Sequence, residues 1–337
     1  MTIILAYLNQ FIRSASAEIK RTKRNQKRRN REKVAILKAE QKKQEIRDAS
    51  ETVKEYNEYI INLISLHKDC SNKYNWEKIR NEKEPSKPIN YHRKEQIARK
   101  KLENFKPGLV TKLFNSENKR LYKLNEKIKK SIEEDKESYN IKIKKYEKDH
   151  SHWKRMQKIL KGVKLGNPKY YQEAMSIIKP FEKIELLNKN LEINFVKNGA
   201  EIDYEVKGSD IIPDFVVSQT STGKLSKKNL PKSKFYALYQ DHICSSAIRI
   251  AREIAAVLPL NIVVINCISE LLNTTTGHLE DSPILSVFIP IQTLNKINLL
   301  NIDPSDSMSN FVCNMKFSKT KGFAPIEKLD IKNYKTN

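Results

Sequence analysis

The chain has 337 residues, enough for about two domains, and its 64 Lys and Arg exceed its 40 Asp and Glu by a formal net charge of +24. Its four cysteines are far apart and form no CxxC pair, so they indicate neither a zinc ribbon nor a disulfide framework and fit a reducing, cytoplasmic setting: Cys70, Cys244, Cys267 and Cys313. The apolar opening, Met1–Ile12, is too short to span a bilayer and lacks the features of a secretory signal.

The positive charge is confined to one half of the chain. Residues 1–200 hold 49 Lys and Arg against 26 Asp and Glu, a net of +23, whereas residues 201–337 hold 15 against 14, a net of +1. Charge gathered in one half indicates a polyanionic partner there, most often nucleic acid and less often an anionic membrane surface.

Residues 1–30 are predicted to form a basic amphipathic helix. The apolar side chains that share one face of its first turns are Ile4, Leu5, Leu8, Phe11 and Ile12. This face can dock on the protein's own helices or lie in a membrane interface, because a basic run follows it.

The basic run is KRTKRNQKRRNREK, Lys20 to Lys33, in which Glu32 is the only acid. Solvated helices usually mix both signs of charge, so this run indicates a negative partner. Phosphate backbones fit, and no aromatic residue between Phe11 and Tyr56 supports base stacking. The candidate nucleic-acid-binding residues are Arg21, Lys23, Arg24, Lys27, Arg28, Arg29 and Arg31. A solvated coiled-coil end and a membrane-surface role remain alternatives.

Residues 31–165 are predicted to form a coiled-coil helical hairpin. Apolar residues recur at three-four spacing from Ile46 to His67 and again from Leu121 to Leu160. Pro85 and Pro88 place a loop near residues 71–92, after which a short helix, 92–105, precedes the second long one. We expect the two long helices to pack antiparallel, and a seam of this kind can also pair between chains.

Residues 166–337 are predicted to form an α/β domain. A helix over 170–189 precedes three strands in a meander, then a second helix ended by Pro259, then two or more buried strands. The expected strands cover 191–196, 200–208, 214–220, 261–269 and 283–291, and the second helix covers 235–258.

One stretch of this domain, EIDYEVKGSDIIPD, contains elements of a metal-dependent nuclease. In enzymes of restriction-endonuclease-like fold, an Asp and an acid-x-Lys element hold Mg²⁺ and orient the attacking water. The residues that would serve are Asp203, Glu205, Lys207 and Asp214. Their order is reversed, however, and the acids alternate along one strand as in an ordinary half-buried strand. Apart from Mg²⁺ under this alternative, no metal or cofactor is predicted.

The second helix of the domain offers two further interpretations. Arg249 and Arg252 could bind phosphate, or Arg249 could pair with Glu253 four residues later, which is the more ordinary arrangement. His242 and Cys244 point about 200° apart on a helix and therefore do not form a ready nucleophile and base. Asp303, in DPSDSMSNF, is expected to cap a turn or a helix start.

Several longer segments carry a resemblance to a known family. These are SLHKDC with NWEKI, KPGLVTKLF, STGKLSKKNLPKSKFYALYQDHICSSAIRIARE, GHLEDSPILSVFI, IDPSD and MKFSKTKGFAPIE. With them the chain resembles a widespread group of bacterial proteins that have a basic coiled-coil front and an α/β end. The resemblance covers nearly the whole chain and implies a shared fold and a bacterial origin. That family has no assigned function, so no catalytic residue is carried over.

The leading hypothesis is a non-enzymatic bacterial protein of the cytoplasm that contacts nucleic acid through its basic helical half, without reading sequence. Arg24, Lys27, Arg28 and Arg29 would neutralise phosphates. The alternatives are a divergent Mg²⁺-dependent nuclease and a membrane-peripheral coiled-coil scaffold. Whether the protein is an enzyme stays open.

Overall fold

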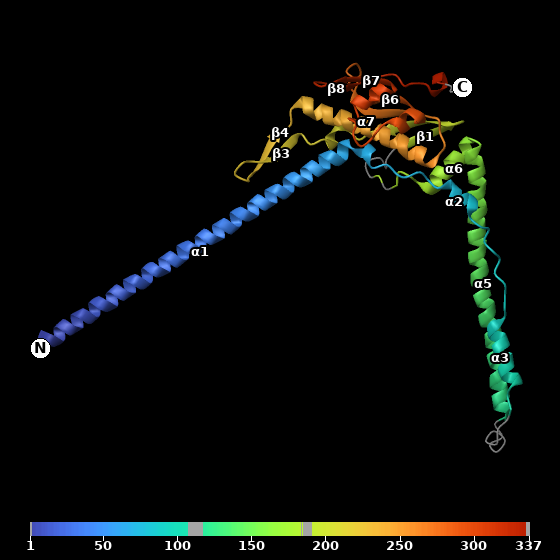
Figure 1. Cartoon of the computed structure of the whole chain (residues 1–337), viewed down its shortest axis with the longest axis horizontal. Helices are drawn as coiled ribbons and strands as arrows, with labels where there is room; N and C mark the ends of the chain where they lie inside the picture. The colour runs from blue at the N-terminus through green and yellow to red at the C-terminus, as the bar shows by residue number, and fades with distance from the viewer. Residues whose placement is uncertain (1, 107–116, 183, 185–190, 335–337) are drawn as a thin grey trace.

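A computed structural model describes residues 2–106, 117–182, 184 and 191–334. The chain forms an α+β body from which two long helices project in different directions (Figure 1). The first, α1 (Thr2–Ile64), contains no Pro or Gly and runs uninterrupted for about 95 Å at 1.5 Å per residue. Its side chains are described from Arg21 onward, so the apolar face predicted for Met1–Ile12 lies outside the described residues.

The base of α1 packs on the α/β body through the predicted apolar stripe. Ala49 and Leu63 are buried, and the stripe faces the hairpin of β3 (Phe215–Gln219) and β4 (Leu225–Asn229). Polar contacts line this interface: Tyr56 Oη donates to the carbonyl of Phe215 at 2.8 Å, and Gln219 Nε2 donates to that of Ile46 at 2.9 Å. At the hairpin turn Gly223 has φ +84°, and a Cβ there would lie 2.7 Å from Cγ1 of Ile46. Glycine therefore permits the hairpin to approach the helix closely.

The second long helix, α5 (Glu117–Lys164), has different partners from those predicted. Its stripe is covered by the short helix α3 (Arg93–Glu103) and by an extended segment that follows α2 (Trp76–Asn81). Trp153 Nε1 donates to the carbonyl of Glu82, and His150 Nε2 lies 2.9 Å from Oε1 of Glu84. The predicted antiparallel hairpin of two long helices is not confirmed, because three-four spacing specifies a buried face but not the element that covers it.

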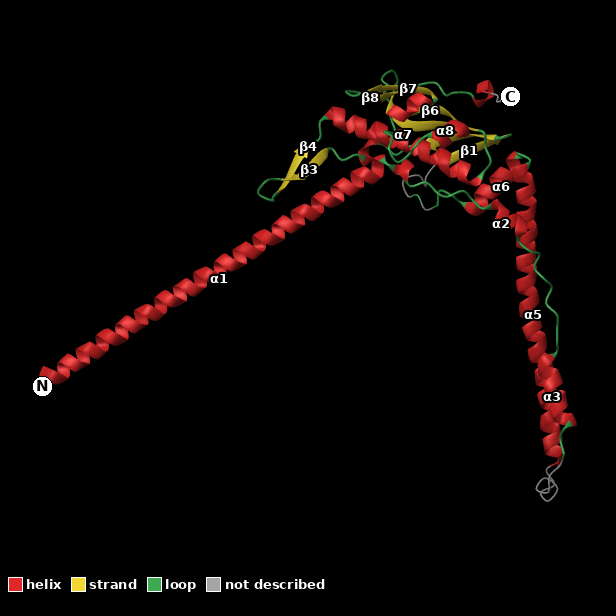
Figure 2. Cartoon of the chain, in the orientation of Figure 1, coloured by secondary structure: helices red, strands yellow, loops and turns green. Residues whose placement is uncertain are grey.

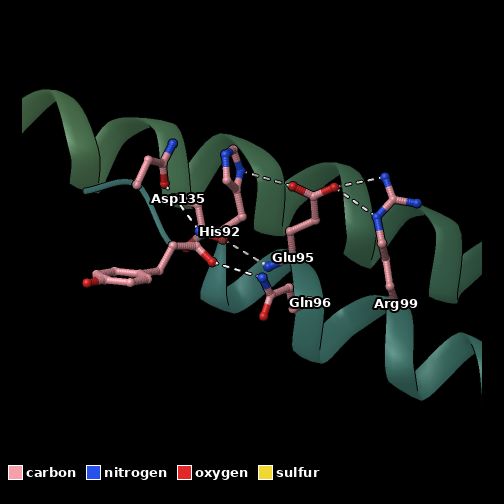
Figure 3. A network of polar contacts seen from close by, with 7 residues as sticks. His92, Glu95, Gln96, Arg99 and Asp135 are labelled. Carbon is pink, nitrogen blue, oxygen red and sulfur yellow. Dashed lines mark hydrogen bonds and ion pairs between the residues drawn. The ribbon is translucent and has the colours of Figure 1, made fainter.

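Asp135 of α5 forms a polar contact with the start of α3 where the two helices pack (Figure 3). Asp135 is 9% exposed, and its Oδ2 accepts from the backbone N–H of Glu95 at 2.9 Å. His92, which precedes α3 with φ 44°, makes no side-chain capping bond. Asp135 therefore satisfies a free amide of the first turn of α3 from a neighbouring helix.

The body is built on a six-stranded sheet of order β1-β2-β5-β6-β7-β8, in which β2 and β5 are parallel and the other neighbours antiparallel (Figure 2). The strands are β1 (Leu191–Val196), β2 (Gly199–Glu205), β5 (Ile262–Leu272), β6 (Leu279–Pro290), β7 (Val312–Ser318) and β8 (Gly322–Ala324). The remaining helices are α6 (Pro168–Ile178), α7 (Lys232–Val257) and α8 (Ile291–Lys296), with 3₁₀ turns at Leu66–Lys68, Ser209–Ile211, Asp306–Asn310 and Ile331–Tyr334.

A single core joins the sheet to both projecting helices. The face of the sheet under α7 presents alternate residues of β2, among them Ile202 and Tyr204, which are 0% and 1% exposed. The same cluster includes Leu63 of α1, Ile159 of α5 and Tyr171 of α6. Both long helices are thus rooted in the hydrophobic core of the body.

The predicted three-strand meander is corrected by the structure. β1 and β2 pair antiparallel as expected, but the third strand, β3, leaves the main sheet and pairs with β4. The other edge of β2 is taken by β5, which arrives after α7. β4 was not predicted because it is short, largely exposed and rich in lysine.

We predict that Leu63→Ala destabilises the protein by about 2–5 kcal/mol, because it leaves a cavity where α1 enters the core. Ile61→Ala, at a neighbouring position that is 58% exposed, is the matched control and should change stability by less than about 0.5 kcal/mol. Urea unfolding measures both. Equal effects would contradict the packing of the α1 base.

Candidate nucleic-acid interface

The basic part of α1 is exposed to solvent throughout. From Arg21 to Glu45 every side chain is exposed, and this stretch holds eleven Lys and Arg against three Glu, a net of +8. All seven candidate residues lie within it: Arg21, Lys23, Arg24, Lys27, Arg28, Arg29 and Arg31. The structure therefore places the predicted cations on one projecting helix, away from the body (Figure 1).

Little of this charge is compensated within the chain. Arg28 Nε lies 3.0 Å from Oε1 of Glu32, but the two side chains are 80% and 57% exposed. A pair of this kind contributes only about 0.3–0.5 kcal/mol. The helix tolerates the excess because Lys and Arg are good helix formers and water screens their repulsion.

The length and rigidity of the segment match a polyanionic rod. Residues 21–45 span about 37 Å at 1.5 Å per residue, and duplex DNA presents one phosphate charge per about 1.7 Å of axis. Arg24 and Arg28 share a face one turn apart, while Lys27 and Arg29 project to either side of it. Because cations lie on all sides, the helix can contact phosphates whatever its rotation about its own axis. This arrangement fits binding without sequence readout.

The second projecting helix is also basic but its charges are mixed. In the first part of α5, residues 117–137, acids alternate with cations and form ion pairs, such as Lys129 with Glu126 and Lys94 of α3 with Glu134, each at 2.9 Å. This interleaving is typical of a solvated helical surface. The second part, residues 138–164, holds nine Lys and Arg against two acids. It is also strongly basic but buries one face, which includes Met156, Ile159 and Val163, whereas residues 21–45 of α1 are exposed on every side and carry a net of +8. This part of α1 is therefore the stronger candidate.

Of the residues of the nuclease alternative, Asp203 and Glu205 lie in β2, whereas Lys207 and Asp214 lie between β2 and β3. Asp203 is occupied by partners outside the predicted motif: its Oδ2 lies 2.6 Å from Nζ of Lys328, and its Oδ1 accepts from Asn266 at 2.8 Å. Glu205 and Asp214 are exposed, and the carbonyl of Lys207 accepts from Tyr239 Oη. Among the residues that the structure describes, no three His, Cys, Asp or Glu are grouped to hold a metal ion.

The predicted pairing within α7 is confirmed. Arg249 Nε lies 2.7 Å from Oε1 of Glu253, with side chains only 8% and 0% exposed. The pair also holds the segment after α1: Arg249 donates to the carbonyl of Leu66 at 3.1 Å, and Glu253 accepts from the backbone N–H of Ser71 at 2.9 Å. Arg249 thus holds the segment that follows α1 against α7.

Two buried histidines complete this anchor. His67 bonds to Ser245 through Nδ1 at 2.9 Å, and His242 donates from Nδ1 to the carbonyl of Leu63 at 2.8 Å. Burial lowers the pKa of both histidines, which favours their neutral form. Cys244 beside them is fully buried, and burial raises the pKa of its thiol. The sequence showed no sign of the His67 contact, since its partner lies 178 residues away.

The functional argument comes from this geometry, because the chain matches no protein-family profile, no curated protein and no solved structure. Within the described part of the chain, no helix is both long and apolar enough to cross a membrane.

Asp303 caps the 3₁₀ turn Asp306–Asn310 as predicted, because its Oδ1 accepts from the backbone N–H of Ser305 and of Asp306.

We predict that Glu253→Ala destabilises the protein by about 3–5 kcal/mol, because it leaves the Arg249 charge buried without its partner. The control is Glu58→Ala, which breaks an exposed pair of the same spacing with Lys54 and should cost less than about 1 kcal/mol. Denaturant unfolding compares the two. A cost for Glu253→Ala as small as that of the control would show that this pair does not hold the α1 base.

Proposed function

We propose that the protein binds nucleic acid through residues 21–45 of α1, by contact with phosphates and without reading base sequence. The observation that carries this proposal is the eleven Lys and Arg of residues 21–45, a part of α1 in which every side chain is exposed. Cations placed in this way gain from binding a polyanion because condensed counterions leave the phosphates.

In this proposal the α/β body holds the base of α1 in place. The buried contacts of Leu63, Arg249 and His67 fix the last turns of α1, so that its basic part projects as a rod. A rod held at one end loses little conformational entropy on binding, in contrast to a disordered basic tail.

A single straight helix meets phosphates with only part of its circumference. If about half of the eleven cations engage, the logarithm of the binding constant should fall with the logarithm of salt concentration at a slope of about −4 to −5. Between 50 and 200 mM salt, affinity would then fall by roughly 10²–10³-fold.

We predict that the fourfold variant Arg24→Glu, Lys27→Glu, Arg28→Glu and Arg29→Glu binds duplex DNA at least about 100-fold more weakly and with a shallower salt slope. The loss should be the same for two labelled duplexes of unrelated sequence, because phosphates are common to both. Fluorescence anisotropy across a salt series measures both quantities.

The matched control reverses four exposed lysines of α5: Lys142, Lys144, Lys145 and Lys148. It changes the net charge by the same amount, so it should lower affinity by less than about tenfold through the long-range field alone. Equal losses in the two variants would mean that total charge, and not the α1 segment, decides binding. Unchanged affinity of the α1 variant would overturn the proposal.

A further inference from the structure

A cavity of about 690 Å³ opens in the α/β body at the C-terminal end of α7. One wall is the segment that follows the α1 anchor, residues 70–73, and the others come from the start of β5, the end of β6 and α8. Its volume lies within the range of about 300–1,000 Å³ that is usual for small-molecule sites.

The polar lining of this cavity is cationic and rich in carboxamides. It comprises the cations Lys73 and Arg252 and the amides Asn72, Asn261, Gln292 and Asn295. None of the residues that line the cavity is an Asp or a Glu. The lining thus offers many hydrogen-bond donors and two positive charges, and the nearby carboxylate of Glu253 is paired with Arg249.

The two arginines of α7 differ in how their charge is satisfied. Arg249 is paired with the buried Glu253, whereas Arg252 donates from Nη1 to the neutral Oδ1 of Asn295 at 2.8 Å. Nε of each arginine is buried without a hydrogen bond among the described residues, but only Arg249 has a carboxylate beside it. Arg252 is only partly buried, and among the described residues no carboxylate pairs with its guanidinium, so an anion with two oxygens can do so.

Two further features bear on the charge of the cavity. The last carbonyls of α7, at Ala256 and Val257, would repel an anion, but they accept from the backbone N–H of Tyr74 at 2.7 Å and from Trp76 Nε1 at 2.6 Å. Burial raises the pKa of the Cys70 thiol at the rim; the positive charges of Arg249 and Arg252 oppose that rise, and the carboxylate of Glu253 adds to it.

We propose that this cavity binds a small organic oxyanion, a phosphate or a carboxylate, which Arg252 and Lys73 hold while the carboxamides bind the rest of the molecule. Arg252 is oriented for this by Asn295, and its planar guanidinium matches either anion. The site lies in the α/β body and does not depend on the nucleic-acid contact of α1.

Isothermal titration calorimetry on the full-length protein tests this site with three probes: AMP, citrate and adenosine. AMP or citrate should bind in a 1:1 ratio, and adenosine, which has no charge, should bind at least tenfold more weakly. Binding of AMP alone would identify the anion as a phosphate, and binding of citrate alone as a carboxylate.

Arg252→Gln should weaken binding of the preferred anion at least tenfold. Lys73→Gln, at an exposed position, should weaken binding of the same anion at least threefold. If Arg252→Gln fails to fold, the Lys73→Gln variant is the test of the site. The matched control, Arg155→Gln on α5, should leave anion binding unchanged, because Arg155 is exposed and outside the cavity lining.

The variant with four reversed charges on α1 separates this proposal from the proposed function. It should retain anion binding in the cavity while losing affinity for DNA. Anion binding that disappears in the α1 variant, that survives in both cavity variants, or that no probe shows in the unaltered protein would overturn the assignment.

Discussion

The structure depends on the attachment of the base of α1 to α7. The buried ion pair of Arg249 with Glu253 and the hydrogen bonds of His67 and His242 hold the turn where α1 ends, and Leu63 fills the core beside them. In this low-dielectric setting the polar contacts are strong and costly to break. Together with the contacts of α1 with the β3–β4 hairpin, they fix the direction of a 63-residue helix relative to the body.

The same chain uses charge in two opposite ways. In the anchor, Arg249 and Glu253 are withdrawn from water, form an ion pair and each bond to one backbone group. On the exposed part of α1, cations are left in water with few acids near them, where screening makes their mutual repulsion tolerable. Such a surface costs little free energy in water, and binding of a polyanion to it is favourable. Arg252 in the cavity is likewise a cation without a carboxylate partner among the described residues.

Much of the local structure could be predicted from the sequence, but its partners could not. Periodicity located α1, α5, α7 and the strands β1, β2, β5 and β6, and the spacing of Arg249 and Glu253 predicted their pair. The partner of each apolar stripe was missed, because the hairpin that covers α1 and the short helix that covers α5 leave no trace in the stripes themselves. The contacts of His67 with Ser245 and of Asp203 with Lys328 join residues more than 100 positions apart. The cavity is likewise assembled from segments around residues 72, 252 and 295, so its charge balance appears only in the fold.

Hydrogen–deuterium exchange of the full-length protein, with and without a 30-base-pair duplex, tests the central claim most directly. The account predicts that the duplex slows amide exchange in residues 21–45 and leaves the sheet and α7 unchanged, because phosphate contacts stabilise the exposed helix against local opening. Protection confined to the α/β body or to α5, with exchange in residues 21–45 unaltered, would contradict it.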